Sequence, residues 1–224
     1  MDRTEILAAI LRERVIGIVR LGDASRVFPV VEAIHAGGAG CIEVSLTTPG
    51  ALAIIREIGE RLPGVVIGAG TVCSPESAEA AVGAGARFLV TPVTLPDLVP
   101  LAHSLGVPIA MGAFTPTEIH AAHAAGAELI KLFPASSLTP GYLRAVLAPF
   151  PDLRLVPTGG VDADNAGEWL AAGAVALGVG GGLTASAAIA AGRYDDLTAY
   201  ARRLMRSVRA GASAPTSQSE IAGS

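Results

Sequence analysis

Short apolar segments rich in β-branched residues recur along the whole chain. They lie at about 15–20, 41–46, 65–71, 87–92, 107–112, 128–133, 154–158 and 174–180. Each segment has the length and composition of a buried strand. The stretches between them, such as "PGALAIIREIGERL" and "TPTEIHAAHAAG", have helical spacing, and several begin with Ser, Thr or Asp and carry an acidic residue in the first turn. Strands and helices are therefore predicted to alternate throughout.

A coarse internal repeat supports this count. The stretches "HAGGAG", "VGAGA", "HAAGA" and "LAAGA" precede the second, fourth, sixth and eighth apolar segments. Each is typical of a helix that ends at a glycine and turns directly into a parallel strand. Eight such units in 224 residues predict an α/β protein with a single (β/α)8 TIM barrel and an extra N-terminal helix, although an open doubly wound sheet would give a similar pattern.

One domain is expected, because no linker divides the chain. The barrel should cover residues 1–209 and end in an amphipathic helix over about 193–209, and "AGASAPTSQSEIAGS" at 210–224 is typical of a disordered tail. The uncharged run 174–192 is mostly Ala and Gly with few large side chains. A buried strand followed by a glycine-rich loop accounts for it better than a membrane span.

Composition favours a small-molecule ligand. The formal net charge is −4 and no basic run occurs, so the sequence lacks the electrostatic footprint of a nucleic-acid or membrane-surface protein. Cys41 and Cys73 lie outside any metal-ligand spacing, and they suit a reducing compartment better than a disulfide framework. Charges interrupt the N-terminal apolar stretch too early for a signal peptide. We therefore expect a cytoplasmic protein.

Lys131 is the single lysine among 16 basic residues, and it lies inside the apolar segment "LIKLF". Alternate residues of a barrel strand face the interior. If Ile130 and Leu132 face the helix layer, Lys131 and Phe133 face inward. A buried lysine has a lowered pKa and can attack carbonyl groups as the neutral amine. The alternative is a structural lysine that is paired with a carboxylate or that reaches solvent at the strand end.

Glu43 is predicted to share the barrel interior with Lys131. In "CIEVSL", Ile42 and Val44 form the apolar face, so Cys41, Glu43 and Ser45 point inward. Even-numbered strands contribute side chains to the same layers of a TIM barrel, which would bring Glu43 close to Lys131. The structural alternative is a satisfied buried ion pair.

Glycine-rich exits follow the seventh and eighth segments, in "PTGGVDADN" and "GVGGGLT". Backbone amides without a neighbouring Cβ can approach an anion closely, and barrels of this type often hold phosphate in these two loops. A pair of glycines also serves a simple tight turn. We expect a phosphate site here, to which Thr158 would add a hydroxyl group.

Weaker candidates lie elsewhere. His120 and His123 have a spacing that could bind a metal, but no third ligand accompanies them, and a solvated helix face is the better interpretation. Thr71 ends the third segment, where it would face a ligand or cap a turn. Arg20 ends the first segment and would either bind a carboxylate or lie at the surface.

Together, "IEVSLTTP", "GAGTV", "KLFPAS" and "PTGGV" resemble the motifs of the 2-keto-3-deoxy-6-phosphogluconate (KDPG) and 4-hydroxy-2-oxoglutarate (KHG) aldolase family, over about residues 10–205. The resemblance implies that Lys131 forms a Schiff base with pyruvate and that Glu43 is the general acid and base. It implies a homotrimer without a metal or other cofactor. The implied substrate contacts are Thr71, Pro92, Phe133, Thr158, Gly159 and Gly160, with Gly181 and Gly182 completing the phosphate site.

Two positions depart from the gluconate-type pattern. Thr47 occupies the position of an arginine that grips the substrate carboxylate, and Gly182 occupies that of a serine that contacts phosphate. The stretch "EVSLTTP" is more similar to the 6-phosphogalactonate (KDPGal) branch, in which an arginine at the position of Arg20 would bind the carboxylate. Arg20 and Thr47 are therefore both expected to face substrate.

The resemblance implies a class I aldolase that cleaves a 2-keto-3-deoxy-6-phospho sugar acid to pyruvate and glyceraldehyde 3-phosphate. One alternative is a lyase for 4-hydroxy-2-oxoglutarate or another keto acid. A further alternative is an isomerase or a noncatalytic phosphate-binding barrel, in which Lys131 and Glu43 form only an ion pair.

Overall fold

The computed structural model describes residues 1–212 and contains one eight-stranded parallel sheet. The strands are β1 (Val15–Val19), β2 (Cys41–Ser45), β3 (Val66–Gly70), β4 (Leu89–Val90), β5 (Ile109–Ala113), β6 (Leu129–Leu132), β7 (Leu155–Pro157) and β8 (Leu177–Val179). Their order is β7-β6-β5-β4-β3-β2-β1-β8, so each strand pairs with its sequence neighbours and β1 also pairs with β8. This order is that of a barrel, and the open doubly wound sheet is excluded.

The barrel closes between β7 and β8. A single bridge joins Thr158 to Gly178, and the Val175 amide donates to the Leu155 carbonyl at 3.1 Å. Thr158 therefore lies at the seam, where the sheet closes with fewer bonds than elsewhere. The predicted (β/α)8 fold is confirmed.

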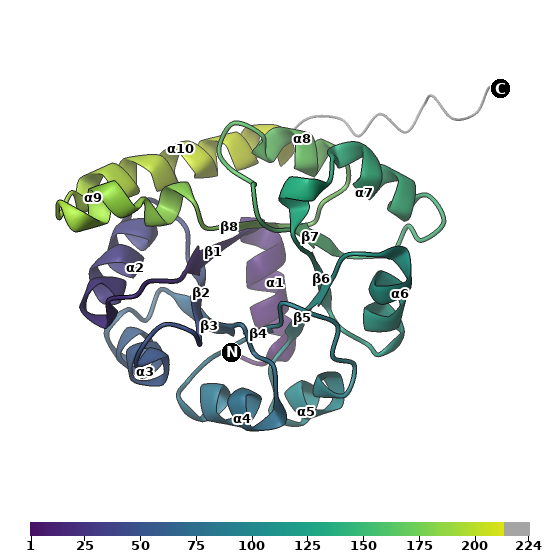
Figure 1. Ribbon diagram of the computed structural model, residues 1–224, viewed down its shortest axis with the longest axis horizontal. Coiled ribbons are helices and arrows are strands. Elements are labelled where there is room, and N and C mark those ends of the chain that lie inside the picture. The colour runs from purple at the N-terminus through teal and green to yellow at the C-terminus, as the bar shows by residue number, and fades with distance from the viewer. Residues whose placement is uncertain (213–224) are drawn as a thin grey trace.

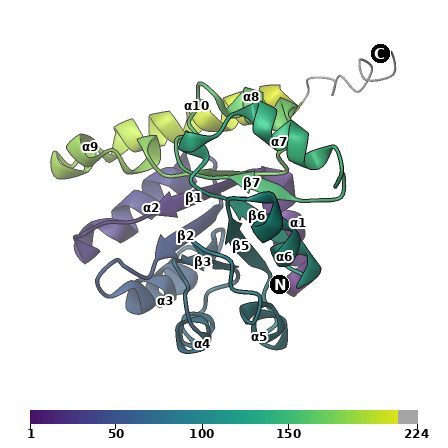
Figure 2. The ribbon, with the colours of Figure 1, turned by 45° about the vertical axis from the view of Figure 1, so that its right-hand side comes forward.

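Helices surround the barrel, and Figure 1 looks down its centre. They are α1 (Arg3–Glu13), α2 (Val27–Ala36), α3 (Ala51–Arg61), α4 (Pro75–Gly83), α5 (Leu98–Ser104), α6 (Pro116–Ala124), α7 (Pro140–Leu147), α8 (Ala166–Ala171), α9 (Ser186–Ala190) and α10 (Tyr194–Ala212). Three short 3-10 helices lie at Ala24–Arg26, Ala135–Ser137 and Gly182–Thr184. The turned view in Figure 2 shows α9 and α10 along one side of the barrel, next to α8.

Local sequence explains where several helices begin. Ser74 and Thr115 cap α4 and α6 by accepting hydrogen bonds from the backbone amides three residues later, and each cap is followed by a proline at the first helical position. Thr139 caps α7 in the same way. The helix starts that the sequence predicts at Ser74 and Thr115 are confirmed.

The side chains of each strand divide between two cores. Ile42, Val44, Ile130 and Leu132 belong to the larger core between the sheet and the helices. Cys41 and Leu129 belong to the smaller core inside the barrel. The predicted alternation along β2 and β6 is therefore confirmed.

Helix α1 closes the end of the barrel where the strands begin. Its residues Ile6, Ala9 and Ile10 are buried and pack on interior residues such as Phe88 and Leu129. Figure 1 shows α1 lying across the barrel's centre behind the strands. The extra N-terminal helix is thus a plug, and the interior opens only at the carboxyl ends of the strands.

The carboxyl-terminal part of the chain differs from the prediction at one boundary. Helix α10 continues to Ala212, three residues beyond the expected end at 209, and the rest of the predicted tail lies outside the described residues. The run 174–192 contains β8 and a glycine-rich loop, as predicted, and none of the helices in the described part of the chain is long and apolar enough to cross a bilayer.

Candidate active site

Lys131 points into the barrel near the carboxyl end of β6. It pairs in register with Gly112 of β5 and Val156 of β7. Its side chain is 8% exposed and that of Glu43 is 3% exposed, and their Nζ and Oε1 atoms are 3.8 Å apart. This distance exceeds that of a direct hydrogen bond, so the two groups face each other without forming one.

A glycine on the neighbouring strand makes room for the Glu43 carboxylate. The register pairs Ser45 of β2 with Gly70 of β3, and a Cβ built on Gly70 would lie 2.5 Å from Glu43 Oε1. Any side chain at position 70 would therefore displace the carboxylate. Burial raises the pKa of Glu43 above its ordinary range, while the positive charges of Lys131 and Arg20 oppose that rise.

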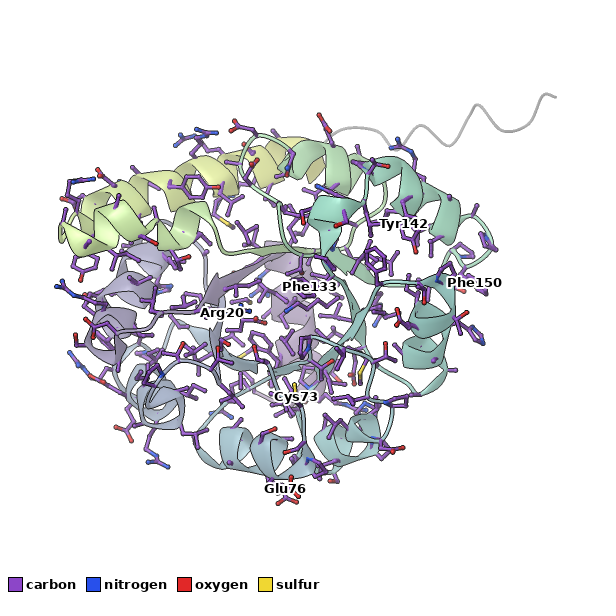
Figure 3. The ribbon with its side chains drawn as sticks, viewed as in Figure 1. Arg20, Cys73, Glu76, Phe133, Tyr142 and Phe150 are labelled. Atoms are coloured by element: carbon purple, nitrogen blue, oxygen red, sulfur yellow. The ribbon has the colours of Figure 1, made fainter. Side chains whose placement is uncertain are left out.

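The aromatic ring of Phe133 lies beside the amine of Lys131. The Nζ atom is 5.3 Å from the centre of the ring, close enough for a cation–π interaction in the protonated state. Figure 3 labels Phe133 and Arg20, and both lie toward the middle of the barrel in that view. Lys131 is thus flanked by one aromatic face and one carboxylate.

A cavity of about 590 Å³ extends from Lys131 across the open end of the barrel. Eight of the residues that the sequence singled out line it: Arg20, Lys131, Phe133, Thr158, Gly159, Gly160, Gly181 and Gly182. The cavity therefore connects the amine at its inner end with the two glycine-rich loops at its far end.

The glycine loops have the geometry that close approach of a ligand requires. Gly159 and Gly160 have φ angles of 89° and 74°, which favour glycine. Among the described residues, the amides of Gly160, Gly181 and Gly182 have no protein acceptor. These N–H groups are available to an anion, as expected of a phosphate cradle.

Thr158 is held by the end of strand β7. It is buried, and its hydroxyl group donates to the Val156 carbonyl at 3.1 Å. A Cβ at Gly178 would lie 2.2 Å from Thr158 Oγ1, so the absence of a side chain there lets the threonine occupy the barrel seam.

Thr47 and Thr71 belong to a separate cluster of hydroxyl groups. Ser45 is fully buried on β2, and its Oγ lies 2.8 Å from the Oγ1 atoms of both threonines. Thr71 has a φ of 61°, which is rare for a β-branched residue and is stabilised here by its surroundings. Neither threonine lines the cavity, and neither does Glu43, which precedes Ser45 on the inward face of β2.

Pro92 also lies outside the cavity lining. Its carbonyl carbon would be 2.4 Å from a Cβ at Gly112, so the proline backbone packs directly on β5. The buried side chain at this strand end is Thr91, whose hydroxyl oxygen accepts from the Gly112 amide at 2.8 Å.

The sequence analysis missed five polar residues that line the cavity: Asp162, Asp164, Thr184, Tyr200 and Arg203. The two aspartates follow the "PTGGV" stretch directly, so they could have been found. Tyr200 and Arg203 lie on α10, whose amphipathic pattern gives no sign that one end of its face reaches the barrel opening.

Of the two histidines on α6, His120 lies against an aromatic ring. His120 stacks on Phe150, with ring centres 5.6 Å apart. Within residues 1–212, no group of three or more His, Cys, Asp or Glu side chains is arranged to hold a metal ion.

Solved structures resemble the whole barrel. A structure described as native KDPGal superimposes with a TM-score of 0.81 at 28% identity, covering 88% of this chain and 95% of that one. KDPG aldolase from Legionella pneumophila, with pyruvate captured as a covalent carbinolamine intermediate, gives a TM-score of 0.81 at 27% identity, covering 89% and 97%. One of the structures that this barrel resembles is thus an enzyme that was captured with covalently bound pyruvate.

Sequence comparison gives the same result. The 2-dehydro-3-deoxy-phosphogluconate aldolase of Pseudomonas aeruginosa is 37% identical over 172 residues, which are 76% of this chain and 78% of that protein. The family model for KDPG and KHG aldolase matches residues 6–200. With Lys131 and Glu43 paired inside its barrel, the chain belongs to the KDPG and KHG aldolase family.

Proposed function

We propose that this protein is a class I aldolase that cleaves a 2-keto-3-deoxy-6-phospho sugar acid into pyruvate and glyceraldehyde 3-phosphate. The observation that carries the proposal is the geometry of Lys131 and Glu43, two buried groups whose Nζ and Oε1 atoms are 3.8 Å apart, with Lys131 lining the cavity. A structural ion pair would be expected to hydrogen-bond directly. This pair instead leaves the amine open to a carbonyl group.

The reaction begins at the amine of Lys131. The neutral amine attacks the C2 ketone, and loss of water gives an iminium ion. Glu43 then takes the proton of the C4 hydroxyl group through a water molecule. The electrons of the C3–C4 bond move to the iminium, which becomes an enamine, and the aldehyde leaves.

Glu43 completes the cycle by returning a proton. It protonates the enamine carbon, and hydrolysis of the resulting iminium releases pyruvate and the free lysine. In the free enzyme, burial raises the pKa of Glu43 more than the neighbouring positive charges lower it. A carboxyl group with a raised pKa can act both as acid and as base near neutral pH.

Two parts of the cavity suit the two charged groups of such a substrate, which are its carboxylate and its phosphoryl group. The cavity lining includes Arg20, which would bind the carboxylate in place of the arginine that Thr47 replaces. The free amides of Gly160, Gly181 and Gly182 would bind the phosphoryl group. An arginine in this position supports a substrate of the phosphogalactonate type.

The first test is the intact mass of the protein after incubation with pyruvate and borohydride. Wild type should gain one reduced pyruvate, and Lys131→Ala and Lys131→Arg should not, because an arginine cannot form the imine. Since the chain has a single lysine, the only other primary amine is the N-terminus, and peptide mapping separates the two. No gain at Lys131 would leave an isomerase or a noncatalytic phosphate-binding barrel.

A second candidate substrate is 4-hydroxy-2-oxoglutarate, because Gly182 adds no side-chain hydroxyl group to the phosphate cradle. Comparing kcat/KM for this keto acid with that for the phosphorylated substrates decides between them. Higher kcat/KM for 4-hydroxy-2-oxoglutarate would contradict a phosphorylated substrate.

We also propose that the protein is a cytoplasmic homotrimer. Large apolar side chains, including Val93 and Phe114, are exposed at the same end of the barrel as the cavity, where a neighbouring subunit would cover them. Light scattering during gel filtration measures the mass in solution, and a monomeric mass would overturn the trimer.

A further inference from the structure

The far end of the cavity is walled by the last helix of the barrel. Tyr200 and Arg203 lie three residues apart on α10, which places their side chains on one face of the helix. Both line the same cavity as Lys131 and the two glycine-rich loops. A ligand that reaches those loops from Lys131 therefore comes next to both side chains.

Tyr200 connects the two glycine-rich loops. Its hydroxyl oxygen accepts a hydrogen bond from the Ala163 amide, at 3.3 Å, in the loop after β7. Its ring packs on Gly182 in the loop after β8, where a Cβ would lie 2.1 Å from Tyr200 Cζ. Gly182 thus lets the phenol occupy a place that any side chain at 182 would take.

The phenol group of Tyr200 keeps a hydrogen atom to donate. Within the described chain, the bond from Ala163 is the only hydrogen bond of this hydroxyl group, and the hydroxyl accepts in it. Burial raises the pKa of Tyr200, and the hydrogen bond from the Ala163 amide and the positive charge of Arg203 only partly oppose that rise. The phenol is therefore protonated at neutral pH and can donate to an anion in the cavity.

Arg203 supplies the only positive charge among the side chains lining this far end. It pairs with Asp164, but its side chain is 48% exposed and that of Asp164 is 80% exposed, so the guanidinium is free to turn. One oxygen of the Asp162 carboxylate, Oδ1, accepts from the backbone amides of Asp164 and Asn165, at 2.8 and 3.0 Å. Without Arg203, the carboxylates of Asp162 and Asp164 would repel a phosphoryl group that enters this part of the cavity.

We propose that Tyr200 and Arg203 are specificity-determining residues that recognise the terminal phosphoryl group of the substrate. The phenol donates a hydrogen bond to a phosphoryl oxygen, and the guanidinium exchanges Asp164 for the phosphoryl group. Asp164 holds Arg203 in place in the empty site and competes with the substrate for it. The inference rests on the proposed aldolase reaction and concerns only its far end.

The test uses the synthetic direction of the reaction, in which pyruvate is joined to glyceraldehyde 3-phosphate or to glyceraldehyde. The two aldehydes differ only in the phosphoryl group. Tyr200→Phe, which keeps the ring, and Arg203→Gln should each raise KM for glyceraldehyde 3-phosphate about tenfold or more. Both should leave KM for glyceraldehyde within about twofold of wild type. Asp164→Asn removes the competing carboxylate and should lower KM for the phosphorylated aldehyde.

Arg202→Gln is the matched control, because Arg202 is the exposed neighbour of Arg203 on α10 and does not line the cavity. Its two KM values should equal those of wild type. The proposal is overturned if Tyr200→Phe and Arg203→Gln leave KM for glyceraldehyde 3-phosphate unchanged, or raise KM for both aldehydes equally. Pyruvate loading of Lys131 by borohydride should persist in all variants. Its absence in wild type would instead refute the aldolase reaction itself.

Discussion

Replacement of Gly70 by alanine should displace the Glu43 carboxylate while leaving both catalytic residues in the chain. The new Cβ would lie 2.5 Å from Glu43 Oε1, whereas ordinary contacts begin at 3.4 Å. The carboxylate must therefore move away by about 0.9 Å, because the new Cβ is fixed to the strand backbone and cannot move instead. A displacement of about 1 Å costs about a hundredfold in rate, which is about 2.7 kcal/mol in the barrier.

The assay is kcat for cleavage of the phosphorylated keto acid, with the melting temperature measured on the same samples. Gly70 has no left-handed φ, so alanine is compatible with the backbone there. Gly83→Ala is the control, because a Cβ at Gly83 would meet nothing within 4 Å. If Gly70→Ala folds normally and keeps kcat within threefold of wild type, the placement of Glu43 does not determine the rate and its assigned role is wrong.

Three further changes test other parts of the structure. Arg20→Gln removes a charge that lowers the pKa of Glu43, so the acidic limb of the pH profile of kcat/KM should move to higher pH; a limb that stays in place would contradict the coupling. Because the pKa of Glu43 is raised in the folded state, protonated Glu43 stabilises that state at pH values below its ordinary pKa of 4.5. This stabilisation is lost as the pH rises through the pKa that Glu43 has in the folded state. In urea titrations, Glu43→Gln should therefore gain free energy of unfolding relative to wild type as the pH rises from about 4 to about 8, and a constant difference would refute the raised pKa. Ile10→Ala should lower the free energy of unfolding by about 2–5 kcal/mol, because Ile10 is 1% exposed in the core under the barrel; a loss below about 1 kcal/mol would show that α1 adds little to stability.

The barrel and the inward residues of its strands could be predicted because strand geometry is local. Period-two alternation in "LIKLF" and "CIEVSL" assigns Lys131 and Glu43 to the interior without knowledge of their neighbours. Because both residues are on even-numbered strands, they are expected in neighbouring or identical layers, and so close together. The 3.8 Å contact confirms this step.

The far end of the site could not be predicted, because it depends on how a helix docks. The pattern of α10 shows which of its faces is apolar, but not that Tyr200 reaches over Gly182. For Pro92, the family resemblance implies a substrate contact that stays a prediction, and the structure adds that its backbone packs on Gly112.

The plug formed by α1 has a kinetic consequence. Because Ile6, Ala9 and Ile10 close the other end of the barrel, the cavity that Lys131 lines opens at the carboxyl ends of the strands. With the phosphoryl group held at the glycine-rich loops, the aldehyde fragment would lie on the solvent side of the enamine, so it should leave before water reaches the last imine. Release should therefore be ordered by position as well as by chemistry, with pyruvate second, and a high concentration of the aldehyde product should slow the release of pyruvate by occupying the same cavity.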